Sequence, residues 1–185
     1  MLKLGLDAAA TQWRVSCVAA DLGLVFYDKV IPSETNPAEV IWTSRDAQTR
    51  LHRIEDPFID QIYLAIVGPD ATRVEKAVRE ALPIHDLEEV LMRIGTGEDE
   101  TTRLATAALL GILAPPSFDP RIFSAFETLL ASTGAAVRAK AITAMAYPEW
   151  AEFRPLLGAL ATDDPDSQVR ERAQFALQAF DRYAS

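Results

Sequence analysis

Few residues in this 185-residue chain are of the types that carry metal-assisted or nucleophilic chemistry. There are two histidines, His52 and His85, and one cysteine, Cys17. A metal site needs three or four converging ligands, and neither histidine has a cysteine or carboxylate at ligand spacing. Cys17 lies between apolar residues with no histidine nearby, which is typical of a small core residue rather than a nucleophile. We therefore predict no catalytic residues, no metal ligands and no cofactor.

Two carboxylates follow segments that have the composition of strands. Asp7 ends the apolar segment 2–6, and Asp70 follows the continuous apolar run 62–67. A two-metal nuclease needs several carboxylates that converge, and these two are the only candidates at strand ends. The chain also lacks the Gly-x-Ser-x-Gly, Gly-Lys-Ser/Thr and Gly-x-Gly-x-x-Gly sequences of common catalytic and nucleotide sites. The sequence favours a protein that is not an enzyme.

The first 85 residues carry the strand signals of the chain. Segments 2–6, 13–19 and 24–31 are rich in apolar and β-branched residues and are separated by short turns, which predicts a three-stranded meander. Asn36 followed by Pro37 is typical of a helix start, and we predict a helix from Ala38 to about Ile54. A buried strand over 62–67 and a helix over 71–82 follow. These elements predict a small α/β domain over residues 1–85.

The remaining residues predict helices alone. Helical segments separated by Gly, Pro and Asp turns are expected near 86–94, 99–113, 120–131, 135–147, 149–162 and 166–182. Six helices joined by tight turns favour three antiparallel pairs. The predicted fold class is therefore α+β, with a small α/β layer followed by an α-solenoid of about three helix pairs over residues 86–185.

A sequence repeat supports this division. Val137-Arg138-x-x-Ala141-x-x-Ala144-Met145 aligns with Val169-Arg170-x-x-Ala173-x-x-Ala176-Leu177, and residues 102–111 form a degenerate third copy that contains Arg103. The pattern resembles the second helix of HEAT repeats, which belong to the armadillo-type helical repeats. The resemblance implies that the pairs stack into a solenoid with a concave binding surface. It also implies that the arginines bind acids or carbonyl groups of the adjacent turn, while the alanines let neighbouring helices approach closely.

The segment from Leu4 to Val15 carries a second resemblance. Its Asp7-Ala8-Ala9-Ala10-Thr11-Gln12 turn is similar to the first hairpin of sugar kinases and actin-like ATPases, which have an RNase H-like fold. That resemblance implies that Asp7 would orient a metal or water and that Thr11 would contact phosphate, with Gln12 beside them. In that family glycines let the backbone wrap a phosphate, whereas alanines stand at positions 9 and 10 here.

The net charge of the chain favours some classes of binding partner over others. The net charge is −9, and residues 86–185 contribute −6 from 15 acidic and 9 basic side chains. A negative field repels nucleic-acid phosphates and anionic lipids and favours a basic partner. No apolar run reaches the length of about 18–20 residues that spans a bilayer, and the N-terminus lacks a secretory pattern. Together with the single cysteine, these features predict a cytoplasmic protein without membrane association.

These observations lead to one principal hypothesis and two alternatives. The principal hypothesis is a non-enzymatic protein-binding module, such as an adaptor, an assembly factor or an inhibitor of immunity type, that uses its helical repeats. The first alternative is a nucleotide- or metal-binding regulator at Asp7 to Gln12. The second is a nucleic-acid-binding helical repeat. Phe175, Leu177 and Phe180 form the last apolar ridge, and we predict either a homodimer contact there or a polar outer face that covers it. The candidate partner-binding residues are Arg103, Arg138, Lys140, Arg170, Arg172 and Gln174.

Overall fold

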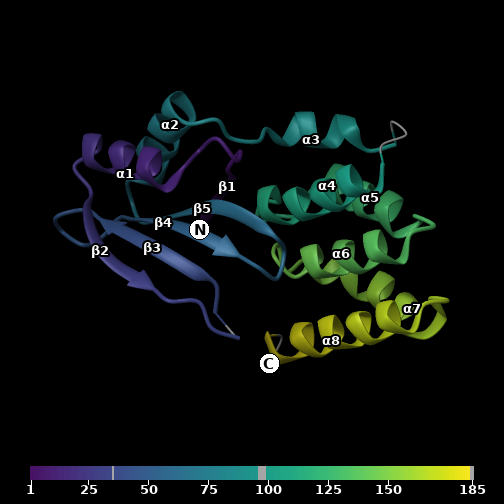
Figure 1. The fold of residues 1–185 in the computed structure, drawn as a ribbon. Coiled ribbons are helices and arrows are strands. Elements are labelled where there is room, and N and C mark those ends of the chain that lie inside the picture. Colours follow the sequence, from purple (N-terminus) through teal and green to yellow (C-terminus); the bar gives the residue numbers. More distant parts are fainter. Residues whose placement is uncertain (35, 96–98, 184–185) are drawn as a thin grey trace. The chain divides into compact units, whose positions relative to one another are not determined.

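A computed structural model of the full chain describes residues 1–34, 36–95 and 99–183. The chain divides into two units, Met1–Asp86 and Leu87–Ser185 (Figure 1). The first contains a β-sheet with two helices and the second contains helices. The predicted α+β class is confirmed at this level.

The first unit is built on a five-stranded sheet. Its elements in chain order are β1 (Leu2–Gly5), α1 (Gln12–Asp21), β2 (Val25–Val30), β3 (Ala38–Thr43), β4 (Arg50–Asp56), β5 (Gln61–Val67) and α2 (Ala71–Ala81). The strand order is β1-β5-β4-β3-β2, and every neighbouring pair is antiparallel. Strands β2 to β5 therefore form a meander, and β1 pairs with its last strand.

Both helices of this unit cover the same side of the sheet (Figure 1). The core between them is apolar and includes Leu4 of β1, Leu51 of β4, Leu64 of β5, Val15 of α1 and Val78 of α2. Along each strand every second residue faces this core, because side chains alternate between the two faces of a sheet. This alternation decides which polar residues of β4 lie beneath the helices.

The predicted strand over 13–19 is wrong, because residues 12–21 form helix α1. Thr11 begins the helix by accepting a hydrogen bond from the backbone N–H of Arg14. The apolar residues that suggested a strand include Val15, Val18 and Ala19, which have helical spacing and are all buried. The predicted three-stranded meander over residues 2–31 is consequently wrong, because this segment holds only the two strands β1 and β2, which lie at opposite edges of the sheet.

The predicted helix over 38–54 is also wrong, because this segment forms the β3–β4 hairpin. Val40 and Trp42 face the core in alternation, as do Leu51 and Arg53, and this period of two is that of a strand. The turn between the strands contains no glycine, which removed the usual hairpin signal. Ala47 takes the positive φ of 59° that glycine or asparagine often provides there.

The second unit confirms the six predicted helices. They are α3 (Leu87–Arg93), α4 (Glu100–Leu113), α5 (Pro120–Leu130), α6 (Ala135–Met145), α7 (Arg154–Asp163) and α8 (Ser167–Tyr183), with the short 3₁₀ helix η1 (Ala151–Phe153) before α7. Consecutive helices pack as the pairs α3–α4, α5–α6 and α7–α8. Helix α6 also packs between α4 and α8, and Figure 1 shows these three helices as successive layers.

Small residues set the spacing between these layers. Ala141, Ala144 and Ala173 are fully buried, and Ala144 faces Gly111 of α4. A Cβ atom on Gly111 would lie 2.5 Å from the carbonyl oxygen of Ala144. The two backbones are thus in direct contact, which only small side chains permit. Among the described residues, no helix is both long enough and apolar enough to cross a membrane.

Candidate functional site

A cleft of about 910 Å³ opens in the sheet unit beside the N-terminal end of α1. Its lining comes from the turn before α1, the ends of β4 and β5, and the segment after α2. Asp7, Thr11 and Gln12, the candidates for nucleotide or metal binding, all line it. The structure therefore gathers these three residues at one hollow.

Hydrogen bonds fix the turn that carries Asp7. Asp7 Oδ1 accepts from the backbone N–H of Ala9 at 2.8 Å, and the Asp7 N–H donates to the carbonyl oxygen of Pro83 at 3.2 Å. Ala9 and Ala10 are not among the described residues with positive φ. The turn leads into a helix with ordinary backbone angles, so it does not form a glycine-type phosphate loop.

Arg53 is a cationic side chain of the cleft, and it is not among the nucleotide- or metal-site candidates predicted from the sequence. It lies on β4 and faces the helix side of the sheet, with Val40 and Leu64 as its cross-strand neighbours. Its side chain is only 6% exposed. Its Nη1 donates to Glu55, and its Nε is a buried donor without a hydrogen-bond partner. A buried donor left unpaired costs about 1–3 kcal/mol, so this atom needs an explanation.

Four carboxylates also line the cleft, among residues that are mostly apolar or uncharged. Asp7, Glu55, Asp56 and Asp60 line the cleft, and together with Arg53 they give a net charge of −3 when His85 is neutral. Asp56 accepts a hydrogen bond from the Phe58 N–H, while Asp60 is exposed. Within the described part of the chain no three His, Cys, Asp or Glu residues are placed to hold a metal ion. The acids therefore surround the cleft rather than converge on one point.

The other candidates for chemistry are dispersed. His52 Nδ1 lies 2.5 Å from Glu39 on the β3–β4 hairpin, whereas His85 lies in the segment after α2 and donates its backbone N–H to Gly5. Cys17 is half-buried on α1 rather than within a strand. Asp70 lies before α2 and accepts a hydrogen bond from Arg73. None of these residues lies together with another in a reactive arrangement.

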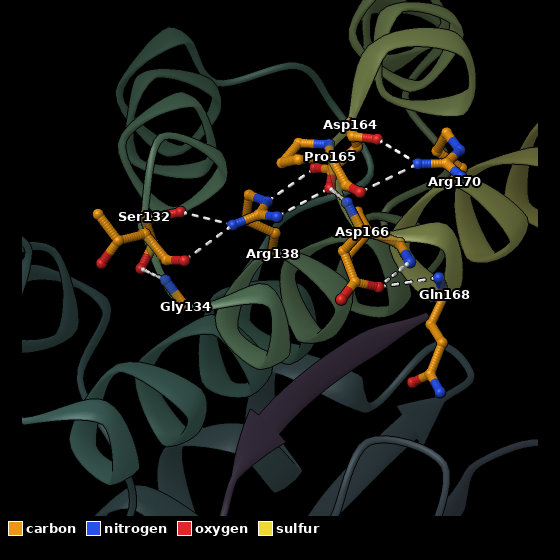
Figure 2. Close-up of polar contacts among 10 residues, drawn as sticks. Ser132, Gly134, Arg138, Asp164, Pro165, Asp166, Gln168 and Arg170 are labelled. Atoms are coloured by element: carbon orange, nitrogen blue, oxygen red, sulfur yellow. Dashed lines mark hydrogen bonds and ion pairs between the residues drawn. The ribbon is translucent and has the colours of Figure 1, made fainter.

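The repeated arginines form the second polar arrangement (Figure 2). Arg138 Nε and Nη2 donate to the two carboxylate oxygens of Asp164 at 2.7 and 2.8 Å. Its Nη1 donates to the carbonyl oxygens of Ser132 and Thr133, six and five residues earlier. The guanidinium therefore joins the α5–α6 turn to the α7–α8 turn, and the prediction that it binds acids and carbonyl groups of adjacent turns is confirmed.

Arg170 repeats this geometry one pair later. Its Nη1 donates to the carbonyl oxygens of Asp164 and Pro165, again six and five residues earlier. Arg103 Nη1 lies 3.4 Å from the Ser132 hydroxyl, in the turn that Arg138 also contacts. Arg138 and Arg170 align in the sequence repeat at a spacing of 32 residues, and they make the same set of backbone contacts. We call this row of side chains and turns the arginine ladder.

The Arg138–Asp164 pair is the most buried ion pair of the ladder. The two side chains are 9% and 2% exposed. The hydrogen bonds from Arg138 lower the pKa of Asp164 below its usual value, although burial opposes the shift. The Asp166 N–H also donates to Asp164 at 2.9 Å. Asp164 is therefore ionised at neutral pH and fully engaged within the fold.

The remaining candidates for partner binding lie on α6 and α8. Lys140 is half-buried, while Arg172 and Gln174 are exposed. Arg172 Nη1 donates to the Thr143 hydroxyl at 2.8 Å. Phe175 on α8 is 63% exposed, whereas Phe180 is only 9% exposed. Of the polar candidates, Arg138 and Arg170 make contacts within the stack, Lys140 is half-buried on α6, and Arg172 and Gln174 are exposed on α8.

Comparison with protein-family models, with curated proteins and with solved structures gave no match. The cleft beside α1 and the arginine ladder are the two polar arrangements of the described residues that bear on function.

Proposed function

We propose that this protein is a non-enzymatic binding protein whose helical unit docks a basic surface of another protein. The observation that carries the proposal is which charged side chains of the arginine ladder are buried and which are exposed. Arg138 is buried in its ion pair with Asp164. The acids Asp99, Glu100 and Asp163 beside the same turns are exposed.

The stack itself supports a HEAT-like solenoid. Three helix pairs pack in order, α6 lies between α4 and α8, and Arg138 and Arg170 make equivalent backbone contacts. In stacked pairs of this kind the turns between paired helices lie along one edge. Arg138 links two of these turns directly through its contacts with Thr133 and Asp164. We refer to the edge formed by these turns as the turn edge.

The turn edge is acidic at its surface. Asp99, Glu100 and Asp163 are exposed, and Asp166 is half-buried at the start of α8. Arg138, in contrast, is buried, and its guanidinium group forms an ion pair with Asp164. The guanidinium group is thus neutralised inside the stack, while exposed carboxylates face solvent.

Charge complementarity selects the occupant. A surface with this excess of carboxylates attracts a protein with clustered Lys and Arg side chains and repels nucleic acid and anionic lipid. The nucleic-acid alternative loses two of its candidate phosphate contacts, since Arg138 and Arg170 are used within the ladder. The proposed class is therefore an adaptor, an assembly factor or an inhibitor of a basic protein.

Charge reversal at the turn edge tests the proposal. The full chain, its Glu100→Lys/Asp163→Lys variant and a control variant are used to capture partners from extract of the source cells. The control, Glu152→Lys/Asp181→Lys, changes the net charge equally at exposed sites on η1 and the last turns of α8. Each captured protein is then purified and its Kd is measured at two salt concentrations.

A partner with a basic surface should bind the wild type and the control equally and bind the turn-edge variant at least about tenfold more weakly. Its affinity should fall as salt is raised, because exposed charges are screened. Retention of the same partners with unchanged Kd by the turn-edge variant would refute the proposal.

A further inference from the structure

Arg53 occupies an unusual place for a charged side chain. It lies in the layer of the sheet that the helices cover, and its cross-strand neighbours, Val40 and Leu64, belong to the apolar core. Burying a guanidinium group there is unfavourable unless its donors are satisfied. The protein satisfies them only in part, since Glu55 takes Nη1 and the buried Nε lacks an acceptor.

The same chain shows what an arginine of this kind can bind. Arg138 uses Nη1 for carbonyl oxygens and grips a carboxylate with Nε and Nη2. In Arg53, Nη1 is likewise occupied, and the Nε side is the one left without an acceptor. Planar carboxylates fit the two parallel donors of a guanidinium edge. An acceptor with the chemistry of Asp164 would satisfy the unpaired Nε of Arg53.

The N-terminal end of α1 favours the same kind of group. The first turn of a helix presents unpaired N–H groups and a partial positive charge. This helix has 10 residues, and Thr11 and Gln12 at its start line the cleft that Arg53 also lines. Two independent features thus favour an anionic oxygen in the cleft.

The acids of the cleft exclude a purely anionic ligand. Asp7, Glu55 and Asp60 carry negative charge around the same hollow, and the lining as a whole is negative. A doubly charged phosphate would be repelled more strongly than a carboxylate by these groups. A ligand that also carries an ammonium group would instead be attracted to them. The described carboxylates do not converge on a metal position, so they suit an organic cation that can extend across the cleft.

We propose that the cleft binds a small zwitterion of the amino-acid class. Its carboxylate lies against the Nε side of Arg53 and the start of α1, and its ammonium group lies among Asp7, Glu55 and Asp60. The volume of about 910 Å³ lies within the range of small-molecule sites. This ligand site lies within residues 1–86 and does not rest on the function proposed for the helical unit.

NMR titration of the full ¹⁵N-labelled chain tests this inference. The twenty common amino acids are added separately at millimolar concentration, and the signals of the Gln12 and Trp13 amides and of Arg53 Nε–H are followed. The best binder is then compared with the amine that lacks its carboxylate and with the acid that lacks its amino group.

At least one amino acid should give saturable shifts at these signals. Both truncated analogues should bind about tenfold more weakly or worse, because each loses one charge-assisted contact. The absence of saturable shifts with all twenty, or equal binding of the deaminated acid, would overturn the proposal.

Two variants locate the contacts. Arg53→Gln should abolish the saturable shifts, whereas Arg50→Gln, on the same strand but beside Tyr27 instead of the cleft, should leave them unchanged. If Arg53→Gln fails to fold, Glu55→Gln decides the matter, because Glu55 is about half-exposed. That variant should weaken the amino acid by at least about threefold through loss of an acid near the ammonium group. Unchanged affinity of Arg53→Gln for the amino acid would contradict the assignment. If that variant does not fold, unchanged affinity of Glu55→Gln would contradict it.

Discussion

Replacing Asp164 with asparagine removes the charge that compensates the buried Arg138 guanidinium while preserving the shape of the side chain. In the wild type, Arg138 donates two hydrogen bonds to this carboxylate at 2.7 and 2.8 Å, in surroundings where Asp164 is 2% exposed. Breaking a buried pair by removing one partner costs about 3–5 kcal/mol. Because asparagine retains one acceptor oxygen, we expect a loss of about 3 kcal/mol in the free energy of unfolding.

The assay is urea denaturation at neutral pH, followed by circular dichroism at the helical band. The matched control is Asp181→Asn, which removes the same charge from the exposed Arg154–Asp181 pair. An exposed pair contributes about 0–1 kcal/mol, so the control should remain close to the wild type. A second measurement uses Arg138→Met and Asp164→Leu singly and together. The double variant should lose less stability than the two single losses combined, because neither charge is then left alone.

A loss below about 1 kcal/mol in Asp164→Asn, equal to that of Asp181→Asn, would refute the reasoning. It would mean that the Arg138–Asp164 pair contributes no more to stability than an exposed ion pair does. The predicted dependence of the stack on its buried arginine would then fail with it.

The same pair predicts a dependence on pH. The hydrogen bonds from Arg138 lower the folded-state pKa of Asp164. A depressed folded pKa gives stability that is present above the unfolded pKa of about 3.9 and is lost as pH falls through the folded value. The wild type should therefore approach Asp164→Asn in stability as pH falls from about 5 toward 2. A constant difference between the two proteins over this range would contradict the shift.

Two further predictions concern glycines at close backbone contacts. Gly111→Ala should destabilise the helical unit by at least about 2 kcal/mol in urea denaturation, because the new Cβ would meet the Ala144 carbonyl oxygen at 2.5 Å. Its control, Gly158→Ala, meets nothing within 4 Å and should be neutral or stabilising by up to about 1 kcal/mol. Gly68→Ala should prevent stable folding of the sheet unit, because Gly68 has a φ of +118° and its Cβ would lie 2.2 Å from a carbonyl oxygen of the β3–β4 turn. Gly23→Ala, with a φ of +75° and open space around it, should cost only about 1 kcal/mol. Equal thermal stability within either pair would contradict the close contacts.

The sequence predicted the helical half well because its signals are local. Asp99 caps α4 through the Thr102 N–H, and Pro120 begins α5 after Asp119. The repeated arginine spacing also indicated which side chains would make equivalent contacts, as Arg138 and Arg170 do. Each of these features is set by residues within one or two helical turns or by comparison of the chain with itself.

The first half was predicted less well because its elements depend on partners that are distant in sequence. Residues 13–19 and 38–54 carry apolar residues that are compatible with helix or strand, and the wrong period was chosen for both. The β3–β4 turn has no glycine, and Ala47 adopts a positive φ there, in a turn that its own hydrogen bonds and the two flanking strands hold in place. Pairing of β4 with β3 and β5 therefore decided the structure of this segment.

Some residues of the candidate cleft could be predicted from the sequence, and others could not. Asp7, Thr11 and Gln12 could be selected from the sequence because their turn resembles the first hairpin of sugar kinases and actin-like ATPases. Arg53 could not be placed in the cleft while its segment was predicted as a helix, although the alternation of Leu51 and Arg53 is visible once the segment is recognised as a strand. What the sequence by itself determined is the composition of the turn, the repeat and the charge. Only the tertiary structure placed Arg53 beneath the helices, because burial beside Val40 and Leu64 arises from strands that meet across the sheet.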